Sequence, residues 1–113
     1  MPVLTINTNI KLEKDVKATL KQLSELCSEM LAKPENYVMI HLNDQQNLMF
    51  AGTYDAAASC SLTSLGLTDQ HTTEYSEQIC QFLESHLNIP SSRIYIEFKA
   101  PERSLFGWNK ATF

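Results

Sequence analysis

A chain of 113 residues, 43% of them hydrophobic, is long enough to bury one core and too short for two, so we expect residues 1–113 to fold as a single domain. The formal net charge of −4, without an excess of Lys and Arg, argues against nucleic acid or an anionic membrane as a partner. The chain shows neither a signal-peptide pattern nor a run of about 20 apolar residues that would predict membrane insertion. These features predict a cytoplasmic protein.

The first half of the chain predicts a strand, a helix and a second strand. Residues 3–6 are β-prone and precede a polar stretch. Between residues 13 and 32, apolar side chains recur at steps of three and four, which is the pattern of a helix packed on one side, and Pro34 ends it. Residues 37–42, rich in β-branched and aromatic types, predict the second strand, and a polar loop follows.

The second half predicts the same order of elements. Residues 57–65 alternate small and apolar side chains, as a strand does, and a helical stripe then begins near Asp69 or Thr72 and ends before Pro90. Residues 93–98 form the clearest predicted strand, because core-type and outward side chains alternate strictly along it. The two faces carry Ile94, Ile96 and Phe98 on one side and Tyr95, Glu97 and Lys99 on the other.

The two halves are related by an offset of 56 residues (90 − 34), which separates Pro34 from Pro90. We therefore expect an α+β fold: a β-α-β-β-α-β protomer with a pseudo-twofold repeat. Right-handed crossovers place both helices on one face of a four-stranded mixed sheet. The other face is uncovered in a monomer, and because we expect it to carry apolar residues, we also expect self-association to bury it.

Two residues suggest proton-transfer chemistry. Removal of the initiator methionine, which is normal before a small residue, leaves Pro2 as a terminal secondary amine. A terminal amine has a pKa of about 8, and burial beside a fixed cation lowers the pKa toward the range where a general base works best. Lys33, at the end of the first helix, is a candidate for that cation and for binding a keto acid. The plainer interpretations are a proline that precedes a strand and a lysine that complements the helix dipole.

Four further side chains are candidates for lining a site. Tyr95 and Glu97 lie two residues apart on a strand and therefore share a face, which either lines a site or faces water. The C-terminal tail is aromatic to its last residue, and Trp108 and Phe113 either bind a ligand or simply pack.

The sequence predicts neither a metal nor a cofactor. The three cysteines, an odd number without CxxC spacing, argue against a disulfide framework and a zinc site, and Cys27 and Cys80 fall on or beside apolar helix faces where we expect inert thiols. The three histidines share no ligand-like spacing. With only three glycines, the chain has no glycine-rich phosphate loop.

Five short motifs follow one another along the chain: Met1-Pro2, Lys33-Pro34 with Tyr37-Val38-Met39, Ser64-Leu65-Gly66, Arg93-Ile94-Tyr95-Ile96, and Gly107-Trp108-Asn109 with Thr112-Phe113. Each motif is weak alone, but their joint order and spacing are specific. Together they resemble the macrophage migration inhibitory factor family of the tautomerase superfamily over essentially the whole chain. The resemblance implies a homotrimer with three pockets at the subunit boundaries and no cofactor.

The resemblance also implies a role for individual residues. Pro2 matches the family's catalytic base, and Lys33 its carboxylate-binding lysine. Leu65 matches the position whose backbone amide contacts the substrate, and Tyr95 matches a pocket tyrosine supplied by the neighbouring subunit. The aromatic wall residues that hold a substrate ring correspond to Trp108 and Phe113. The implied reaction is keto–enol tautomerisation of arylpyruvates such as phenylpyruvate and hydroxyphenylpyruvate, or of dopachrome-type compounds.

The sequence also departs from the family pattern. Glu97 stands where many members have Asn, so its carboxylate would raise the pKa of the amine or repel an anionic substrate. Phe106 replaces a smaller aliphatic residue and would narrow the pocket mouth; we count both among the substrate-binding residues. Ala57 replaces the first cysteine of a CxxC and leaves only Cys60, which argues against a thiol redox enzyme. The main alternative is a cytokine-like protein, secreted without a signal peptide, that binds a protein receptor.

Overall fold

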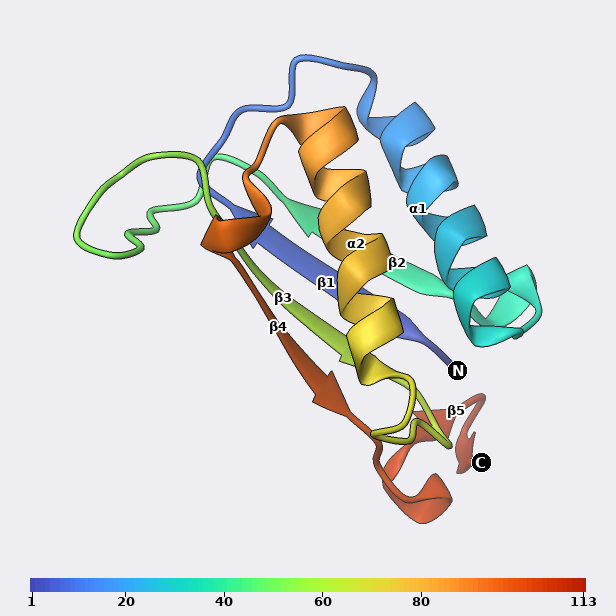
Figure 1. Ribbon diagram of the computed structural model, residues 1–113. Coiled ribbons are helices and arrows are strands. Elements are labelled where there is room, and N and C mark those ends of the chain that lie inside the picture. Colours follow the sequence, from blue (N-terminus) through green and yellow to red (C-terminus); the bar gives the residue numbers. More distant parts are fainter.

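The computed structural model describes residues 1–113 and contains two similar halves followed by a short hairpin (Figure 1). The first half consists of β1 (Val3–Thr8), α1 (Val16–Leu31) and β2 (Met39–Asn43). The second half consists of β3 (Ala58–Thr63), α2 (Thr72–Leu87) and β4 (Ile94–Lys99). The C-terminal hairpin is formed by β5 (Gly107–Trp108) and β6 (Ala111–Thr112). The predicted β-α-β-β-α-β order is confirmed, with the hairpin added to it.

The four long strands form one mixed sheet in the order β2-β1-β3-β4. Within each half the two strands run parallel, and β1 pairs antiparallel with β3 where the halves meet. Both helices cover the same face of this sheet (Figure 1). The expected arrangement of two helices on a four-stranded mixed sheet is therefore confirmed.

The internal repeat is close to exact in the structure. The helices begin 56 residues apart (72 − 16) and end 56 residues apart (87 − 31). Each helix ends at a residue in the left-handed conformation, Ala32 with φ 52° and Asn88 with φ 56°. A proline and a single 3₁₀ turn then follow, Glu35–Tyr37 in the first half and Ser91–Arg93 in the second.

Some predicted element boundaries shift for local reasons. The first helix begins at Val16 rather than near residue 13, because the Asp15 side chain accepts the Lys17 N–H at 3.0 Å and caps the helix there. Tyr37 lies in a 3₁₀ turn rather than in the strand, because its N–H donates to the Pro34 carbonyl at 3.1 Å. The second strand therefore starts at Met39.

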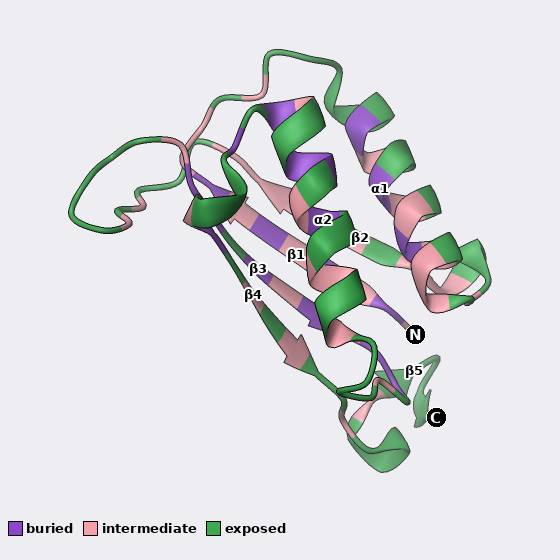
Figure 2. Ribbon diagram, viewed as in Figure 1, coloured by how far each residue is buried: buried purple, intermediate pink, exposed green.

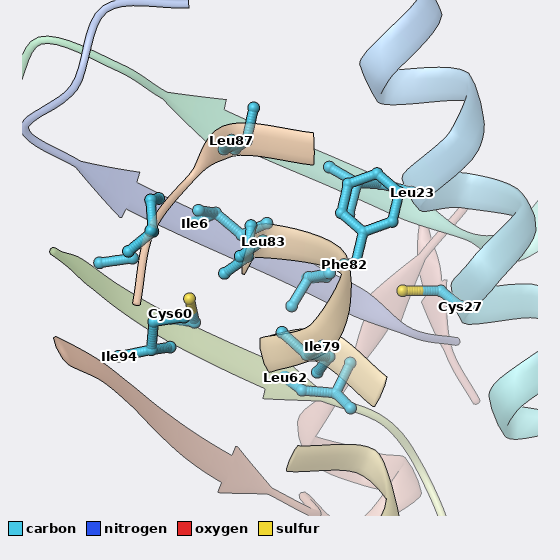
Figure 3. Close-up of a cluster of buried hydrophobic side chains, with 13 residues drawn as sticks. Ile6, Leu23, Cys27, Cys60, Leu62, Ile79, Phe82, Leu83, Leu87 and Ile94 are labelled. Atoms are coloured by element: carbon cyan, nitrogen blue, oxygen red, sulfur yellow. The ribbon is translucent and has the colours of Figure 1, made fainter. Parts of the chain in front are cut away.

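The hydrophobic core lies between the helices and the sheet and draws on both halves of the chain (Figures 2 and 3). It contains 13 buried residues: Leu4, Ile6, Leu23, Cys27, Ala58, Cys60, Leu62, Ile79, Phe82, Leu83, Leu87, Ile89 and Ile94. The alternating strand residues and the helix stripes thus face each other, as their spacing predicts. Neither helix combines the length and apolar character needed to cross a membrane.

The expectation of an apolar open face is wrong. Side chains that alternate with the core residues point away from the helices. In strand order from β2 to β4, these open-face residues are Met39, His41, Asn43, Val3, Thr5, Asn7, Ser59, Ser61, Thr63, Tyr95, Glu97 and Lys99. Most are hydroxyls, amides or charges, so burial of apolar area on this face supplies little drive for association.

Candidate active site

Pro2 lies directly before β1, with its side chain fully buried. Its carbonyl accepts the Met39 N–H at 2.9 Å, so the sheet already fixes this residue. In the chain as it stands, Met1 carries the terminal amine, whose pKa is lowered first by burial and second by the positive charge of Lys33. An amine at this place is therefore biased toward its neutral, proton-accepting form.

Lys33 is held beside the chain terminus by the end of α1. Its N–H donates to the Ser28 carbonyl at 3.1 Å, and the Ser28 hydroxyl donates to the Lys33 carbonyl at 2.6 Å. The side chain is half-buried and forms no ion pair with a carboxylate of the chain. The ammonium is thus free to bind an anionic group and lies close enough to the terminal amine to lower its pKa.

The C-terminal tail builds an aromatic cluster that includes a residue the sequence analysis missed. The Trp108 and Phe113 rings stack with centroids 5.5 Å apart, and Phe106 meets Phe113 edge-on at 5.7 Å. Tyr37 packs edge-on against Trp108 at 5.6 Å and against Phe113 at 6.4 Å. Because Tyr37 ends the 3₁₀ turn that follows Lys33 and Pro34, the cluster lies at the same end of the sheet as Lys33.

The backbone of the tail is fixed by its own hydrogen bonds. Asn109 and Lys110 both adopt positive φ, 51° and 65°, which forms the two-residue hairpin turn between β5 and β6. The Phe113 N–H donates to the Phe106 carbonyl at 3.1 Å, and Arg103 Nε donates to the Phe113 carbonyl at 3.0 Å. The last aromatic residue is therefore tied down and not a loose end.

Leu65 supplies a backbone donor rather than a side chain. It is buried, with 7% of its surface exposed, and lies between the end of β3 and Gly66, whose φ is 78°. The neighbouring Ser64 N–H donates to the Lys99 carbonyl at 3.0 Å, whereas the Leu65 N–H donates to no acceptor within the chain. A fixed, unused N–H is a group that can stabilise a developing oxyanion.

Tyr95 does not join this site within one chain. Its partner across β3 is Ser59, which in turn pairs with Asn7 of β1. Pro2 precedes Asn7 by five residues, which is about 16 Å at about 3.3 Å per residue. Tyr95 is also 70% exposed, so its ring lies on the open surface, away from the chain terminus.

Glu97 lies beside Tyr95 on the open face and is paired. Its Oε1 lies 3.0 Å from Lys99 Nζ, and both side chains are largely exposed. Tyr95 and Glu97 line a shallow hollow of about 340 Å³ together with Asn7, Ser59 and Ser61. The carboxylate therefore carries its own counter-charge, which the sequence analysis did not anticipate.

The cavities of the single chain do not unite the predicted residues. Phe106 lines a cavity of about 620 Å³ with Thr63, Lys99, Ala100, Pro101, Leu105 and Gly107. The largest hollow, about 1010 Å³, runs along α2 and is lined by none of the predicted site residues. Pro2 and Lys33 line none of the larger cavities.

The cysteines belong to the core and its edge. Burial raises the pKa of Cys27 and of Cys60 to about 12, and burial also raises the pKa of the half-buried Cys80. All three are free thiols; Cys27 is buried, as expected from its helix position, whereas Cys80 is only half-buried and lines the hollow along α2. The chain contains no group of three or more His, Cys, Asp or Glu side chains arranged to hold a metal ion.

Comparisons with known proteins agree with this architecture over the full length. The sequence model of "Macrophage migration inhibitory factor (MIF)" matches residues 1–113. The chain is 39% identical to the macrophage migration inhibitory factor homolog of Brugia malayi over 114 residues, which covers 100% of this chain and 99% of that protein. A solved structure of the homologue from Prochlorococcus marinus shares 35% identity and a TM-score of 0.94, covering 98% of each chain. The Trichinella spiralis structure gives a TM-score of 0.93 at 35% identity, covering 98% of this chain and 99% of that one.

A doubled β-α-β unit with a proline at the start of its first strand, close to a lysine, defines a protein of the tautomerase superfamily. Within that superfamily, the full-length match settles the closer relationship. The chain belongs to the macrophage migration inhibitory factor family.

Proposed function

We propose that residues 1–113 act as one catalytic domain, a keto–enol tautomerase of arylpyruvates whose general base is the secondary amine of Pro2 after removal of Met1. The observation that carries the proposal is the lowered pKa of the terminal amine beside Lys33. With Met1 removed, the amine moves to Pro2, whose ring is buried at the beginning of the sheet and which stays beside Lys33, so the same two causes favour the neutral base there.

The proposed reaction needs three groups at the end of the sheet where β1 begins. The Pro2 amine takes the proton from the carbon next to the substrate carbonyl, and the bonding electrons move onto the carbonyl oxygen as an enolate. Lys33 binds the substrate carboxylate, and the free Leu65 N–H donates to the developing oxyanion. Transfer of the proton to the enolate oxygen gives the enol, and the reverse sequence returns the ketone.

The aromatic residues position the substrate ring in this proposal. Phenylpyruvate, hydroxyphenylpyruvate and dopachrome-type compounds all carry a ring that suits a wall made by Tyr37, Phe106, Trp108 and Phe113. The contribution of these residues is orientation and not bond-making. Trp108 is 53% exposed in the single chain, which leaves one face of its ring available.

We propose a homotrimer because the site is incomplete in one chain. Tyr95 lies about 16 Å along the sheet from Pro2, too far to contact the same small substrate. Both edge strands, β2 and β4, also leave one side of their backbone without a strand partner. A neighbouring subunit that brings its Tyr95 and Glu97 to Pro2 and Lys33 completes the pocket.

A Pro2→Gly variant tests the base. It removes the secondary amine while keeping a small second residue, so Met1 removal continues and intact mass verifies it. The Pro90→Gly variant is the matched control, because Pro90 is the repeat counterpart of Pro34 and lies outside the proposed site. We expect phenylpyruvate enolisation to fall by about 10²- to 10⁴-fold in Pro2→Gly and to persist in Pro90→Gly. Unchanged turnover in Pro2→Gly, with the assembly intact by light scattering, rejects the mechanism.

A protein ligand with a cytokine-like role is the second candidate, supported by the relatives named for macrophage migration inhibition. The two roles separate in one variant. Binding of a cell-surface receptor by the inactive Pro2→Gly protein supports signalling independent of turnover, and loss of both activities together ties them to the same pocket.

A further inference from the structure

The long loop between β2 and β3 presents one aromatic side chain, Phe50, in a fixed position. Phe50 and Thr53 exchange backbone hydrogen bonds of 3.1 and 3.0 Å. The two residues between them, Ala51 and Gly52, have φ of 53° and 76°, the double left-handed conformation of a tight hairpin turn. The loop as a whole extends from the sheet (Figure 1), but its Phe50 segment closes into a hydrogen-bonded two-residue hairpin.

Arg93 ties this hairpin to the beginning of β4. Its Nη2 donates to the carbonyls of Phe50 at 3.1 Å, Asp55 at 3.1 Å and Thr53 at 3.5 Å, and its Nε donates to the Ala56 carbonyl at 2.9 Å. The guanidinium forms no ion pair with a carboxylate, so its donors serve the loop backbone. Its Cζ also lies 5.1 Å from the centroid of the Phe50 ring, a cation–π contact.

Tyr95 contacts the same ring. The Phe50 and Tyr95 centroids lie 4.9 Å apart with an angle of 71° between the planes, the preferred edge-to-face geometry. Apart from this ring, Tyr95 is open to solvent, with 70% of its surface exposed. Arg93, Phe50 and Tyr95 therefore form a continuous contact chain, in which the loop ring is held by the arginine and meets the tyrosine.

We propose that Phe50, held in place by Arg93, is a positioning residue for Tyr95 and sets the affinity of the site for the aromatic ring of the substrate. The proposal rests on the proposed function, in which Tyr95 enters the pocket of the neighbouring subunit. An exposed tyrosine with free rotamers must be ordered when the substrate binds, which weakens binding. A ring already held by Phe50 avoids that cost, so the effect falls on substrate binding and not on proton transfer.

The test compares Phe50→Leu with Phe50→Tyr. Leucine keeps the apolar bulk but loses both the edge-to-face and the cation–π contact, whereas tyrosine keeps the ring. We expect Phe50→Leu to raise KM for phenylpyruvate by about 3- to 10-fold with kcat nearly unchanged, and Phe50→Tyr to resemble the unmodified protein. Phe82→Leu is the matched control, because it also removes an aromatic ring, but from the hydrophobic core and not from the loop, so we expect it to leave KM unchanged.

An Arg93→Lys variant tests the same contact from outside the loop, in case Phe50→Leu does not fold. Lysine keeps the charge but loses the planar fork that bridges four carbonyls, so the same rise in KM follows if the clamp acts through Phe50. A spectroscopic measurement is independent of turnover. With 3-fluorotyrosine at the four tyrosines, assigned by a Tyr95→Phe variant, we expect Phe50→Leu to shift and narrow the Tyr95 fluorine resonance alone.

The outcomes separate the two proposals. An unmodified protein that does not turn over arylpyruvates overturns the proposed function, and the positioning role of Phe50 falls with it. Normal turnover together with an unchanged KM in both Phe50→Leu and Arg93→Lys overturns the positioning role alone. An unchanged Tyr95 fluorine resonance in Phe50→Leu also overturns it, because the ring would then not be held by Phe50.

Discussion

Replacing Asn9 by Ala tests how the long loop that carries Phe50 is attached to the sheet. Asn9 follows β1, and its Nδ2 donates to the carbonyls of Leu48 at 3.3 Å, Tyr54 at 3.1 Å and Asp55 at 2.9 Å. Its Oδ1 accepts the Ala57 N–H at 3.0 Å. One side chain therefore binds both arms of the loop.

The cost of the substitution follows from what each partner loses. Ala57 is fully buried and its N–H has no acceptor other than Asn9, so an unpaired donor costs about 1–3 kcal/mol. Tyr54 and Asp55 are exposed, so water replaces the lost donor at their carbonyls and each bond is worth only about 0.5 kcal/mol. We expect Asn9→Ala to lower the free energy of unfolding by about 2–4 kcal/mol.

Urea unfolding monitored by circular dichroism, at fixed protein concentration because assembly contributes to stability, measures this loss. Asn47→Ala is the control: Asn47 is an exposed residue of the same loop whose side chain forms no hydrogen bond within the chain, and its change should stay within about 0.5 kcal/mol. If Asn9→Ala is as stable as Asn47→Ala, the loop is not held by this side chain and the reasoning is refuted.

Three further predictions follow from burial and charge. Lys33→Met raises the pKa of the terminal amine, because the cation that disfavours the protonated form is removed. The acid limb of the profile of kcat/KM against pH then moves to higher pH. An identical profile contradicts the role of Lys33 in lowering this pKa. The thiols of Cys27 and Cys60, each with a pKa of about 12, remain unmodified by a thiol reagent at pH 8 in the folded protein, so at most Cys80 reacts until denaturant is added. Leu83→Ala, at a fully buried position, lowers the free energy of unfolding by about 2–5 kcal/mol in a denaturant titration.

The helices and strands were predictable because their signals are local. The apolar steps of three and four fixed both helices, and the prolines at 34 and 90 fixed their ends and the repeat. The 3₁₀ turns were missed, because Tyr37 has strand propensity and Arg93 directly precedes the alternating strand residues. Only the hydrogen bonds to the preceding proline carbonyls place the two residues in turns. The polar open face was missed for a related reason: in β3, the small hydroxyl residues that alternate with Cys60 and Leu62 were not assigned to a face.

The candidate site was less predictable than the fold. The resemblance pointed to Pro2, Lys33 and Trp108 as site residues. Nothing in the local sequence marks Tyr37 as part of the aromatic cluster, since its partner Trp108 lies 71 residues away (108 − 37). Long-range contacts of this kind leave no periodic pattern. The same holds for Phe50, whose contact with Tyr95 depends on the shape of the loop and on Arg93.

The Glu97–Lys99 pair changes the expected effect of having Glu97 where many members of the family have Asn. A lone carboxylate in the proposed pocket would repel an anionic arylpyruvate, but the Lys99 ammonium lies 3.0 Å from it. Both groups are more than half exposed, so the pair adds little to stability, yet at a distance the two charges cancel. A substrate in the proposed pocket would then meet the field of a dipole and two hydrogen-bonding groups, not a net negative charge. The structure therefore favours a changed hydrogen-bonding pattern in the proposed pocket over a general exclusion of anions.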